Sequence, residues 1–163
     1  MKNSASVKDK IYNRIDLARQ VERWKLLNKK VVFTNGCFDI LHKGHIELLS
    51  KAAQLGDILI VGLNADSSVK KLKGEERPVN DENFRSEIMA GLLIVDAVSL
   101  FEEDTPYELI ETIVPDILVK GGDYKPEDVV GAETVIKNGG NVEIIPLVKG
   151  YSTTGIIQKI REL

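Results

Sequence analysis

The sequence predicts an α/β fold built on a doubly wound parallel sheet of about five strands. Short apolar runs typical of buried strands alternate along the chain with segments of helical periodicity. Polar turns, several of them rich in glycine, follow these runs, as expected where parallel strands end at one edge of a sheet. We therefore expect the strand order 3-2-1-4-5, with the switch point between the first and fourth strands.

Length and composition restrict the class of protein. The chain has 163 residues, 43% of them hydrophobic, which suits one globular domain with its own core. Its 22 basic and 25 acidic residues give a net charge of −3, which argues against nucleic acid as a partner. The single cysteine, Cys37, excludes an internal disulfide. No apolar run approaches the ~20 residues that span a bilayer, and no signal peptide is evident, so a cytoplasmic protein without membrane contact is expected.

The first part of the chain predicts a helical extension. Residues 1–8 are polar and are expected to fray. From Asp9 to Leu27 apolar side chains recur at steps of three and four, which predicts an amphipathic helix packed on the domain or on a second subunit. We expect residues 1–29 to form this extension and residues 30–163 to form the domain that carries the function.

A strand, a turn and a helix follow in the order that matters most for function. The apolar run Val31–Phe33 leads through a turn at Gly36 into a helix that ends near Leu55. The chain's only two histidines, His42 and His45, lie between the strand and this helix. Their spacing puts both on one side of a helical turn, where unpaired N–H groups and the helix dipole favour an anion. This arrangement predicts a phosphate site, with Gly44 allowing a bound group to approach the backbone.

The remaining elements complete the alternation. Further strands are predicted at Ile58–Leu63, Ala97–Phe101, Ile117–Val119 and Val142–Pro146. Further helices are predicted at Glu82–Ile94, Thr105–Val114 and Ala132–Asn138, with a last one that follows the stretch Gly150–Gly155 and runs to the C-terminus.

Polar residues that follow these strands are candidates for the same ligand site. The lysines of the stretch Lys70–Gly74 suit phosphate or a solvated loop equally. Arg85 lies in the first turn of its predicted helix, where the dipole disfavours a cation, and this suggests either an anionic partner or a plain surface arginine. Lys120 and the glycine pair after it allow a ligand close to the backbone, and the hydroxyls of 152–154 suit helix caps or phosphate.

These motifs resemble a known family. The string from Asn35 to His45, with its His-Lys-Gly-His end, is similar to the first motif of nucleotidyltransferases with a His-x-Gly-His signature, which have a Rossmann-like sheet. The segments 64–69, 73–78, 119–124 and 151–154 are similar to one branch of that family, the heptose 1-phosphate adenylyltransferases of lipopolysaccharide core precursor synthesis. The missing arginine before the final Ser-Thr-Thr, and Cys37 in place of a threonine, depart from the glycerol 3-phosphate cytidylyltransferases.

The resemblance implies a reaction and a set of site residues. The reaction is transfer of AMP from ATP to heptose 1-phosphate, with Mg²⁺ assisting and no residue of the chain assigned as a metal ligand. Catalytic roles fall to His42, His45 and Arg85, and substrate contacts to Asp66 and Arg77. Nucleotide-binding residues would be Asn35, Gly36, Phe38, Asp39, His42, Gly44, His45, Lys71, Lys73, Lys120, Gly121, Asp123, Ser152, Thr153 and Thr154.

The resemblance also implies partners. Some relatives fuse this domain to a sugar kinase, for which 163 residues leave no room, so a stand-alone form with a separate heptose kinase is expected, as is a homodimer. Two alternatives stay open from the sequence. One is a cytidylyl- or adenylyltransferase for another small phosphorylated substrate such as glycerol 3-phosphate, and the other is a non-catalytic nucleotide-binding module. A dinucleotide-dependent oxidoreductase is excluded because no Gly-x-Gly-x-x-Gly follows the first strand.

Overall fold

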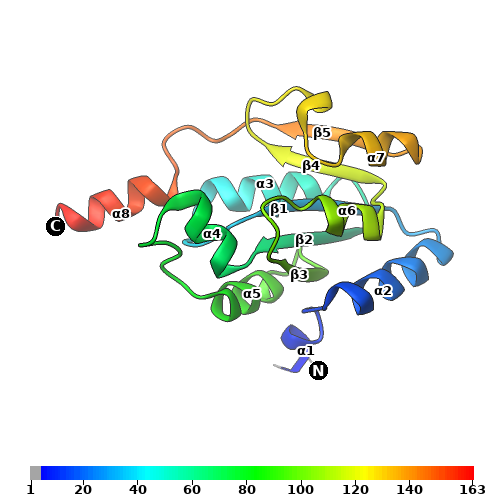
Figure 1. The fold of residues 1–163 in the computed structure, drawn as a ribbon, viewed down its shortest axis with the longest axis horizontal. Helices are drawn as coiled ribbons and strands as arrows, with labels where there is room; N and C mark the ends of the chain where they lie inside the picture. Colours follow the sequence, from blue (N-terminus) through cyan, green and yellow to red (C-terminus); the bar gives the residue numbers. More distant parts are fainter. Residues whose placement is uncertain (1–4) are drawn as a thin grey trace.

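A computed structural model describes residues 5–163 of the chain. In this part the strands form one five-stranded parallel sheet in the order β3-β2-β1-β4-β5 (Figure 1). The predicted fold class and strand order are therefore confirmed. The strands are β1 Val31–Gly36, β2 Ile58–Asn64, β3 Ala97–Phe101, β4 Ile117–Gly121 and β5 Asn141–Ile145.

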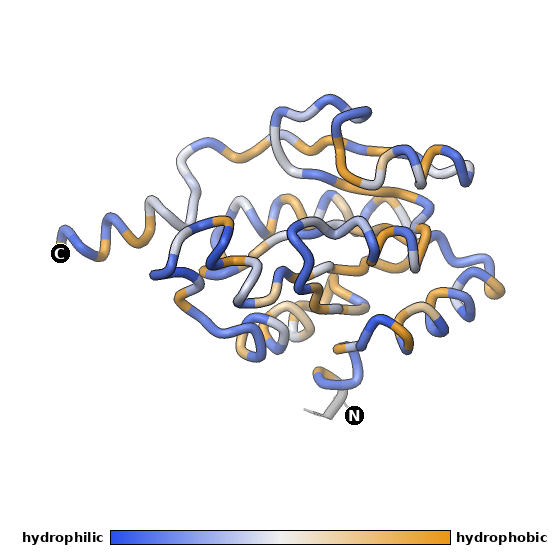
Figure 2. Tube along the Cα trace, viewed as in Figure 1, coloured by the Kyte–Doolittle hydropathy of each residue, from blue (hydrophilic) through white to orange (hydrophobic). Residues whose placement is uncertain are grey.

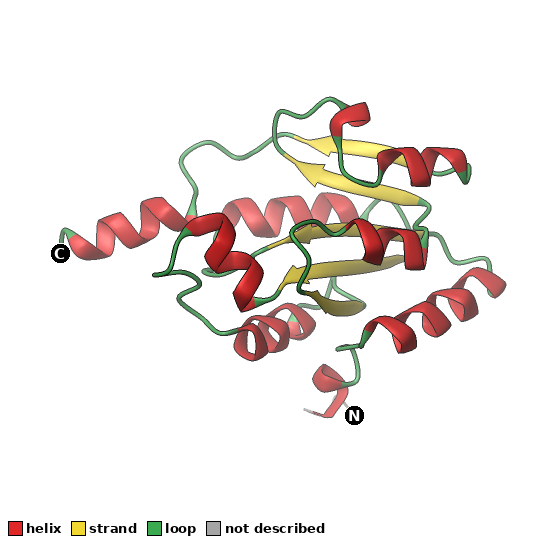
Figure 3. Ribbon diagram, in the orientation of Figure 1, coloured by secondary structure: helices red, strands yellow, loops and turns green. Residues whose placement is uncertain are grey.

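Helices connect successive strands and cover both faces of the sheet (Figure 3). They are α1 Ala5–Lys8, α2 Arg14–Leu26, α3 Lys43–Ala53, α4 Asp66–Lys73, α5 Glu82–Gly91, α6 Tyr107–Ile113, α7 Ala132–Lys137 and α8 Thr153–Arg161, with a 3₁₀ turn, η1, at Pro126–Asp128. Within residues 5–163, none of these helices is long and apolar enough to cross a bilayer.

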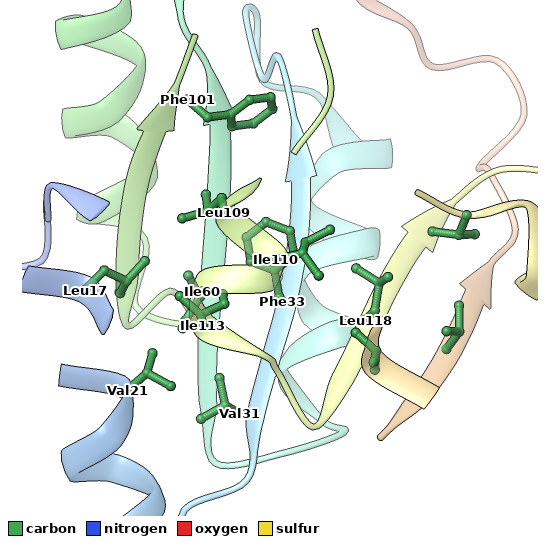
Figure 4. Packing of buried hydrophobic residues seen from close by; sticks show 14 of the residues in the cluster. Leu17, Val21, Val31, Phe33, Ile60, Phe101, Leu109, Ile110, Ile113 and Leu118 are labelled. Carbon is green, nitrogen blue, oxygen red and sulfur yellow. The ribbon is translucent and has the colours of Figure 1, made fainter. Parts of the chain in front are cut away.

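The hydrophobic core has two layers because side chains alternate between the faces of each strand. On one face, Val31 and Phe33 of β1 pack in a cluster with residues of α2, α6 and α7, as the close view in Figure 4 shows for Leu17 and Ile110. On the other face, Val32 packs in a cluster with residues of α3 and α5. With both faces covered, the polar carboxyl edge of the sheet is the natural place for a ligand.

The helix predicted from Asp9 to Leu27 is shorter than expected. Ile11 forms a parallel bridge to Val98 of β3, so this part of the chain is extended along the edge of the sheet. The helix begins only at Arg14, where the Asn13 side chain accepts a hydrogen bond from the backbone N–H of Asp16. Residues 1–4, part of the stretch expected to fray, lie outside the described residues, and Ala5–Lys8 form the short helix α1.

Two further boundaries differ from the sequence prediction. The polar stretch after β2, considered as a solvated loop, is the helix α4. The helix after it ends at Gly91 rather than Ile94, because Leu92 is extended and its carbonyl, with that of Val95, accepts hydrogen bonds from Lys10 Nζ at 3.3 and 2.7 Å. Asp81 caps this helix, because its side chain accepts a hydrogen bond from the N–H of Phe84.

Helix α8 differs from the other helices in how little it packs. It extends away from the sheet at one end of the molecule, with hydrophobic and hydrophilic residues alternating along it (Figures 1 and 2). None of its residues is buried. Its first turn nevertheless lies against the loop after β1, because the Thr153 hydroxyl donates a hydrogen bond of 3.3 Å to the carbonyl of Ile40.

Candidate active site

A cavity of about 650 Å³ opens at the carboxyl edge of the sheet. It is lined by residues at the ends of β1, β2 and β4, by the start of α3, by the loops after β3 and β5, and by the first turn of α8. Ligands of open α/β sheets bind at this edge, next to the switch point that separates β1 from β4. The cavity is therefore the candidate active site.

The histidine pair lies in this cavity at the amino-terminal end of α3. His42 is the N-cap residue and His45 is in the first turn, so both lie where the helix dipole is positive. Their rings stack with centroids 3.7 Å apart and planes 21° apart. The Nδ1 atoms of both rings are buried without a hydrogen-bond partner among the described residues. A buried polar atom in this state is a place where a ligand can complete the structure.

Burial keeps both histidines neutral near pH 7. It lowers the pKa of His42, and together with a smaller contribution from His42 it lowers the pKa of His45 from 6.5 to about 4. Desolvation disfavours the charged ring, whereas a bound anion would favour it. The pair is therefore a neutral site that a phosphate can convert into a set of N–H donors.

Two close packing contacts hold the histidine rings in place. A Cβ on Gly44 would lie 3.1 Å from two ring atoms of His42, so this glycine makes room for the histidine, rather than for the bound group that we expected. Phe38 packs edge-on against His45 with centroids 5.1 Å apart. Its backbone has a left-handed φ of 43°, a strained conformation that is typical of functional loops. Gly36 gives the Phe38 ring its space, since a Cβ there would lie 3.0 Å from it.

Asp39 joins the loop after β1 to the segment before α5. Its carboxylate, with the residue 3% exposed, accepts hydrogen bonds from Arg77 Nε at 2.8 Å and from the backbone N–H groups of Val79 and Asn80 at 2.9 Å. Burial raises its pKa, but the hydrogen bonds from Asn80, Val79 and Arg77 outweigh this, and the pKa lies below its ordinary value. Asp39 and Arg77 both line the cavity, as an ion pair.

Arg85 has a different place from the one predicted. It is only 1% exposed and does not line the cavity. Its guanidinium donates to the carbonyls of Cys37, Asn64 and Asn80 at 2.7, 2.8 and 3.0 Å and to Asp66 Oδ1 at 2.7 Å. The expected catalytic cation is thus a buried positioning residue that connects three segments around the cavity.

The same ion pair corrects the prediction for Asp66. Its carboxylate faces Arg85 rather than the cavity, and its backbone N–H donates to Glu82 at 2.8 Å. The substrate contact expected there is not supported by this geometry.

The end of β4 brings a lysine and a tyrosine to the cavity. Lys120 donates to Asn35 Oδ1 at 3.3 Å and lies 5.9 Å from the ring centroid of Tyr124. Burial lowers the pKa of Lys120. Gly122 has a φ of 137°, and a Cβ there would lie 2.7 Å from the Tyr124 ring. Gly122 therefore makes room for this ring, while Gly121 lines the cavity.

Three polar residues of this edge divide between cavity and solvent. Lys73 lines the cavity, whereas Lys71 does not and instead pairs with Asp104 at 3.1 Å. Asp123 is exposed and does not line the cavity. The predicted nucleotide contacts of Lys71 and Asp123 are therefore not supported.

Three hydroxyl residues at the start of α8 lie at the cavity. Ser152 caps the helix by accepting a hydrogen bond of 3.0 Å from the N–H of Gly155. Ser152, Thr153 and Thr154 all line the cavity. Beside them, Lys43 lies 5.6 Å from the ring centroid of Tyr151.

Several cavity residues were not singled out from the sequence. They are Asn64, Asp104, Thr105, Tyr124 and Tyr151. The first three end or follow β2 and β3, so the rule that ligand residues follow parallel strands could have found them. The two tyrosines lie within motif segments but carry no spacing signal of their own.

The sequence model of the cytidylyltransferase-like family matches residues 33–159 of the chain. This range contains the histidine pair, Lys120 and the Ser-Thr-Thr segment, and leaves out α1 and α2.

Curated relatives share more than half of their residues with the chain over the aligned length. The bifunctional protein HldE of Trichlorobacter lovleyi is 55% identical over 153 residues, which is 94% of this chain and 31% of the relative. HldE of Citrifermentans bemidjiense is 58% identical over 151 residues, or 93% of this chain and 31% of the relative. The chain thus spans about a third of the length of these relatives.

Solved structures share the fold. A lipopolysaccharide core biosynthesis protein from Thermoplasma volcanium is 33% identical, with a TM-score of 0.59, over 76% of this chain and 99% of that one. A pantoate-beta-alanine ligase from Francisella tularensis, complexed with beta-gamma ATP and beta-alanine, has the same TM-score of 0.59 at 17% identity, over 94% and 78% of the two chains. The second likeness is evidence of fold alone.

Proposed function

The chain belongs to the cytidylyltransferase-like family of nucleotidyltransferases, and from this premise we propose that it transfers AMP from ATP to heptose 1-phosphate, forming ADP-heptose and pyrophosphate. The observation that carries the proposal is the stacked pair His42 and His45 at the start of α3, with both Nδ1 atoms buried and without partners among residues 5–163. The similarity to a lipopolysaccharide core biosynthesis protein supports a sugar phosphate as acceptor.

The reaction needs no general base from the protein. A sugar 1-phosphate is largely dianionic near pH 7, since its second pKa is about 6, so one of its oxygens can attack directly. That oxygen forms a bond to the α-phosphorus of ATP while the bond from the α-phosphorus to the bridging oxygen breaks. The electron pair leaves with pyrophosphate, and no proton transfer is required for the balance.

The protein's part is to hold the reactants in line and to stabilise charge. His42 and His45 donate to phosphate oxygens whose charge grows as pyrophosphate leaves, aided by the positive end of α3. Lys120 and Lys73 add positive charge from the two sides of the cavity. The N–H and hydroxyl groups of 152–154 bind the end of the triphosphate.

We further propose that Mg²⁺ enters with ATP, bound chiefly to its phosphate oxygens. Across residues 5–163 no three His, Cys, Asp or Glu side chains are grouped to hold a metal, and the oxygens of Asp39 already accept hydrogen bonds from Arg77, Val79 and Asn80. Such a cavity fits an ion that keeps its water and phosphate ligands. When bound, Mg²⁺ would neutralise part of the charge on the leaving pyrophosphate.

The test is a matrix of ATP and CTP against heptose 1-phosphate and glycerol 3-phosphate, scored by pyrophosphate release. We expect release with ATP and heptose 1-phosphate, and much less with the other combinations. Comparable turnover with CTP and glycerol 3-phosphate would overturn the substrate assignment. Binding of ATP without release for any acceptor would favour a non-catalytic module.

Two proposals about partners go with this function. A separate kinase would supply heptose 1-phosphate. Two copies of the chain would pair through α2, where Ile15, Leu26 and Leu27 are 66%, 83% and 70% exposed although Leu17 and Val21 pack in the chain's own core. Light scattering at micromolar concentration should give the mass of a dimer, and a monomer would contradict the pairing.

A further inference from the structure

The segment before β1 is attached to the outer edge of the sheet. The backbone of Val98 in β3 donates to the carbonyl of Lys10 at 2.8 Å and accepts from the N–H of Tyr12 at 2.9 Å. Leu17 and Val21 of α2 are buried in the core cluster that contains Val31 and Phe33 of β1. The start of α2 is thereby fixed relative to β3 and to the loop that follows it.

Arg14, the first residue of α2, uses this fixed place to hold two acidic residues. Its Nη2 donates to Glu103 in the loop 102–106, and its Nη1 lies 2.9 Å from Glu108 Oε2 in the first turn of α6. The guanidinium therefore bridges the loop and the helix that the loop enters. A planar fork with two carboxylate partners fixes geometry better than a single flexible ion pair.

The loop 102–106 forms one wall of the cavity. Asp104, Thr105 and Pro106 line it, immediately after the residue that Arg14 holds. The Asp104 carboxylate, whose Oδ1 also pairs with Lys71 at 3.1 Å, and the Thr105 hydroxyl suit the hydroxyl groups of a sugar, because carboxylate oxygens accept hydrogen bonds from hydroxyls. This wall is therefore suited to the sugar of the acceptor substrate.

A second set of hydrogen bonds connects the same loop to a residue that lines the cavity. The carbonyl of Glu103 accepts from the Ser68 hydroxyl at 3.3 Å, and that hydroxyl accepts from Asn64 Nδ2 at 2.9 Å. Ser68 and Asn64 are 0% and 4% exposed, and Asn64 lines the cavity. Displacement of Glu103 would therefore disturb Asn64 at the cavity through these two hydrogen bonds.

We propose that Arg14 is a positioning residue that holds the loop 102–106 in the shape that binds the sugar of the acceptor. The inference rests on the proposed function for the identity of that acceptor. Arg14 lies outside the range 33–159 that the family model matches, so the contact comes from the segment that precedes this range. That segment thus helps to set acceptor specificity.

The test compares Arg14→Ala and Arg14→Lys with Arg19→Ala in the full chain. Arg19 is a matched control on the same helix, because its only ion pair among residues 5–163 is with Asp16 of α2, at 3.4 Å. We expect Arg14→Ala to raise KM for heptose 1-phosphate about 3- to 10-fold, with KM for ATP changed less than about 2-fold. Arg14→Lys, which keeps one ion pair, should recover part of this loss, and Arg19→Ala should behave as the wild type.

Hydrogen–deuterium exchange gives a second readout that does not depend on activity. In Arg14→Ala, the amides of residues 102–105 should exchange faster, while those of β1 and α3 stay unchanged. Unchanged exchange and unchanged KM would overturn the inference, as would equal increases of KM for both substrates, which would indicate general loss of structure. Failure of the wild type to use any sugar phosphate would overturn the proposed function instead, and the exchange result would still report on the loop.

Discussion

Two polar clusters at the same edge of the sheet differ in how far their hydrogen bonds are satisfied. In the histidine pair, the Nδ1 atoms of His42 and His45 are buried and lack partners among the described residues. In the network of Asp39, Arg77 and Arg85, donors of both arginines and the oxygens of Asp39 are bonded within the protein. Unsatisfied groups mark where a ligand completes the site, and satisfied ones mark what holds the site in shape. Substitutions in the first cluster should therefore alter rate, and those in the second should alter stability first.

The largest expected effect is a loss of kcat on substitution in the histidine pair. His45→Ala removes a preorganised donor to a developing charge, which typically costs about 10²–10³ in kcat, or roughly 3–4 kcal/mol. KM for ATP should change less, because the interaction strengthens mainly in the transition state. Steady-state kinetics and thermal melting of the same preparation check this. A near-normal kcat, or a defect confined to a lower Tm, would show that the residue has only a structural role.

For the second cluster, Arg85→Ala should lower the free energy of unfolding. The change leaves Asp66 and three carbonyls without their buried partner, and loss of one member of a buried pair costs about 3–5 kcal/mol. Urea unfolding of this variant beside Arg19→Ala, an exposed arginine expected to change stability by about 0.5 kcal/mol or less, measures the difference. Equal unfolding midpoints for the two variants would contradict the positioning role.

The strands could be predicted because each is a buried apolar run followed by a turn, and burial is what the sequence records best. The start of α2 could not, because Ile11 fits the helical stripe as well as it fits the edge of β3, and only the bridge to Val98 decides between them. α4 was missed for a related reason. Its polar run buries only Ser68 and Val69, so the lysines obscure the helix.

The sequence could predict which residues lie at the strand ends, but not which of them face the cavity. Lys120 and the histidines follow strands directly, so topology alone brings them to the cavity. Arg85 and Asp66 come from the same region of sequence, yet they pair with each other and do not line the cavity. Whether an arginine faces a ligand or a set of carbonyls depends on packing between distant segments, which spacing does not record.

The dependence of stability on pH should also come from the histidine cluster. The pKa of His45 is 6.5 in the unfolded chain and about 4 when folded, so the unfolded state takes up its proton first as pH falls. The free energy of unfolding should therefore decrease between pH 6.5 and about 4, and be unaffected by this residue above pH 6.5. Denaturant unfolding of the wild type and His45→Gln at pH 7 and pH 5 measures it. If the variant loses as much stability as the wild type over this interval, His45 is not the source of the pH dependence.

A smaller effect on kcat is expected at Gly44, which adjoins the ring of His42. Gly44→Ala places a Cβ 3.1 Å from the His42 ring, so the ring must shift and kcat should fall about 3- to 10-fold. Gly91→Ala is the matched control, since no atom of the neighbouring residues that the structure describes lies within 4 Å of its added Cβ, and alanine favours the helix by up to about 1 kcal/mol. If both variants keep full activity, the ring geometry of His42 does not matter for the rate.

The smallest effect is expected at Cys37. Burial raises the pKa of its thiol, so little thiolate exists at pH 7, and no step of the proposed transfer needs one. Its carbonyl, not its side chain, accepts the hydrogen bond from Arg85 at 2.7 Å. Cys37→Ser should keep most of the wild-type kcat in the pyrophosphate assay. A complete loss in a folded variant would assign the thiol a role that the proposed chemistry lacks.

The most direct test of the account is to follow oxygen atoms through the reaction by ³¹P NMR. Heptose 1-phosphate labelled with ¹⁸O on its phosphate is incubated with ATP and the wild-type protein. Direct attack on the α-phosphorus predicts ADP-heptose with ¹⁸O in the bridge between its two phosphorus atoms, seen as an isotope shift of the α signal, and unlabelled pyrophosphate. An unshifted α signal, or label in pyrophosphate, would contradict the proposed transfer in the histidine cavity.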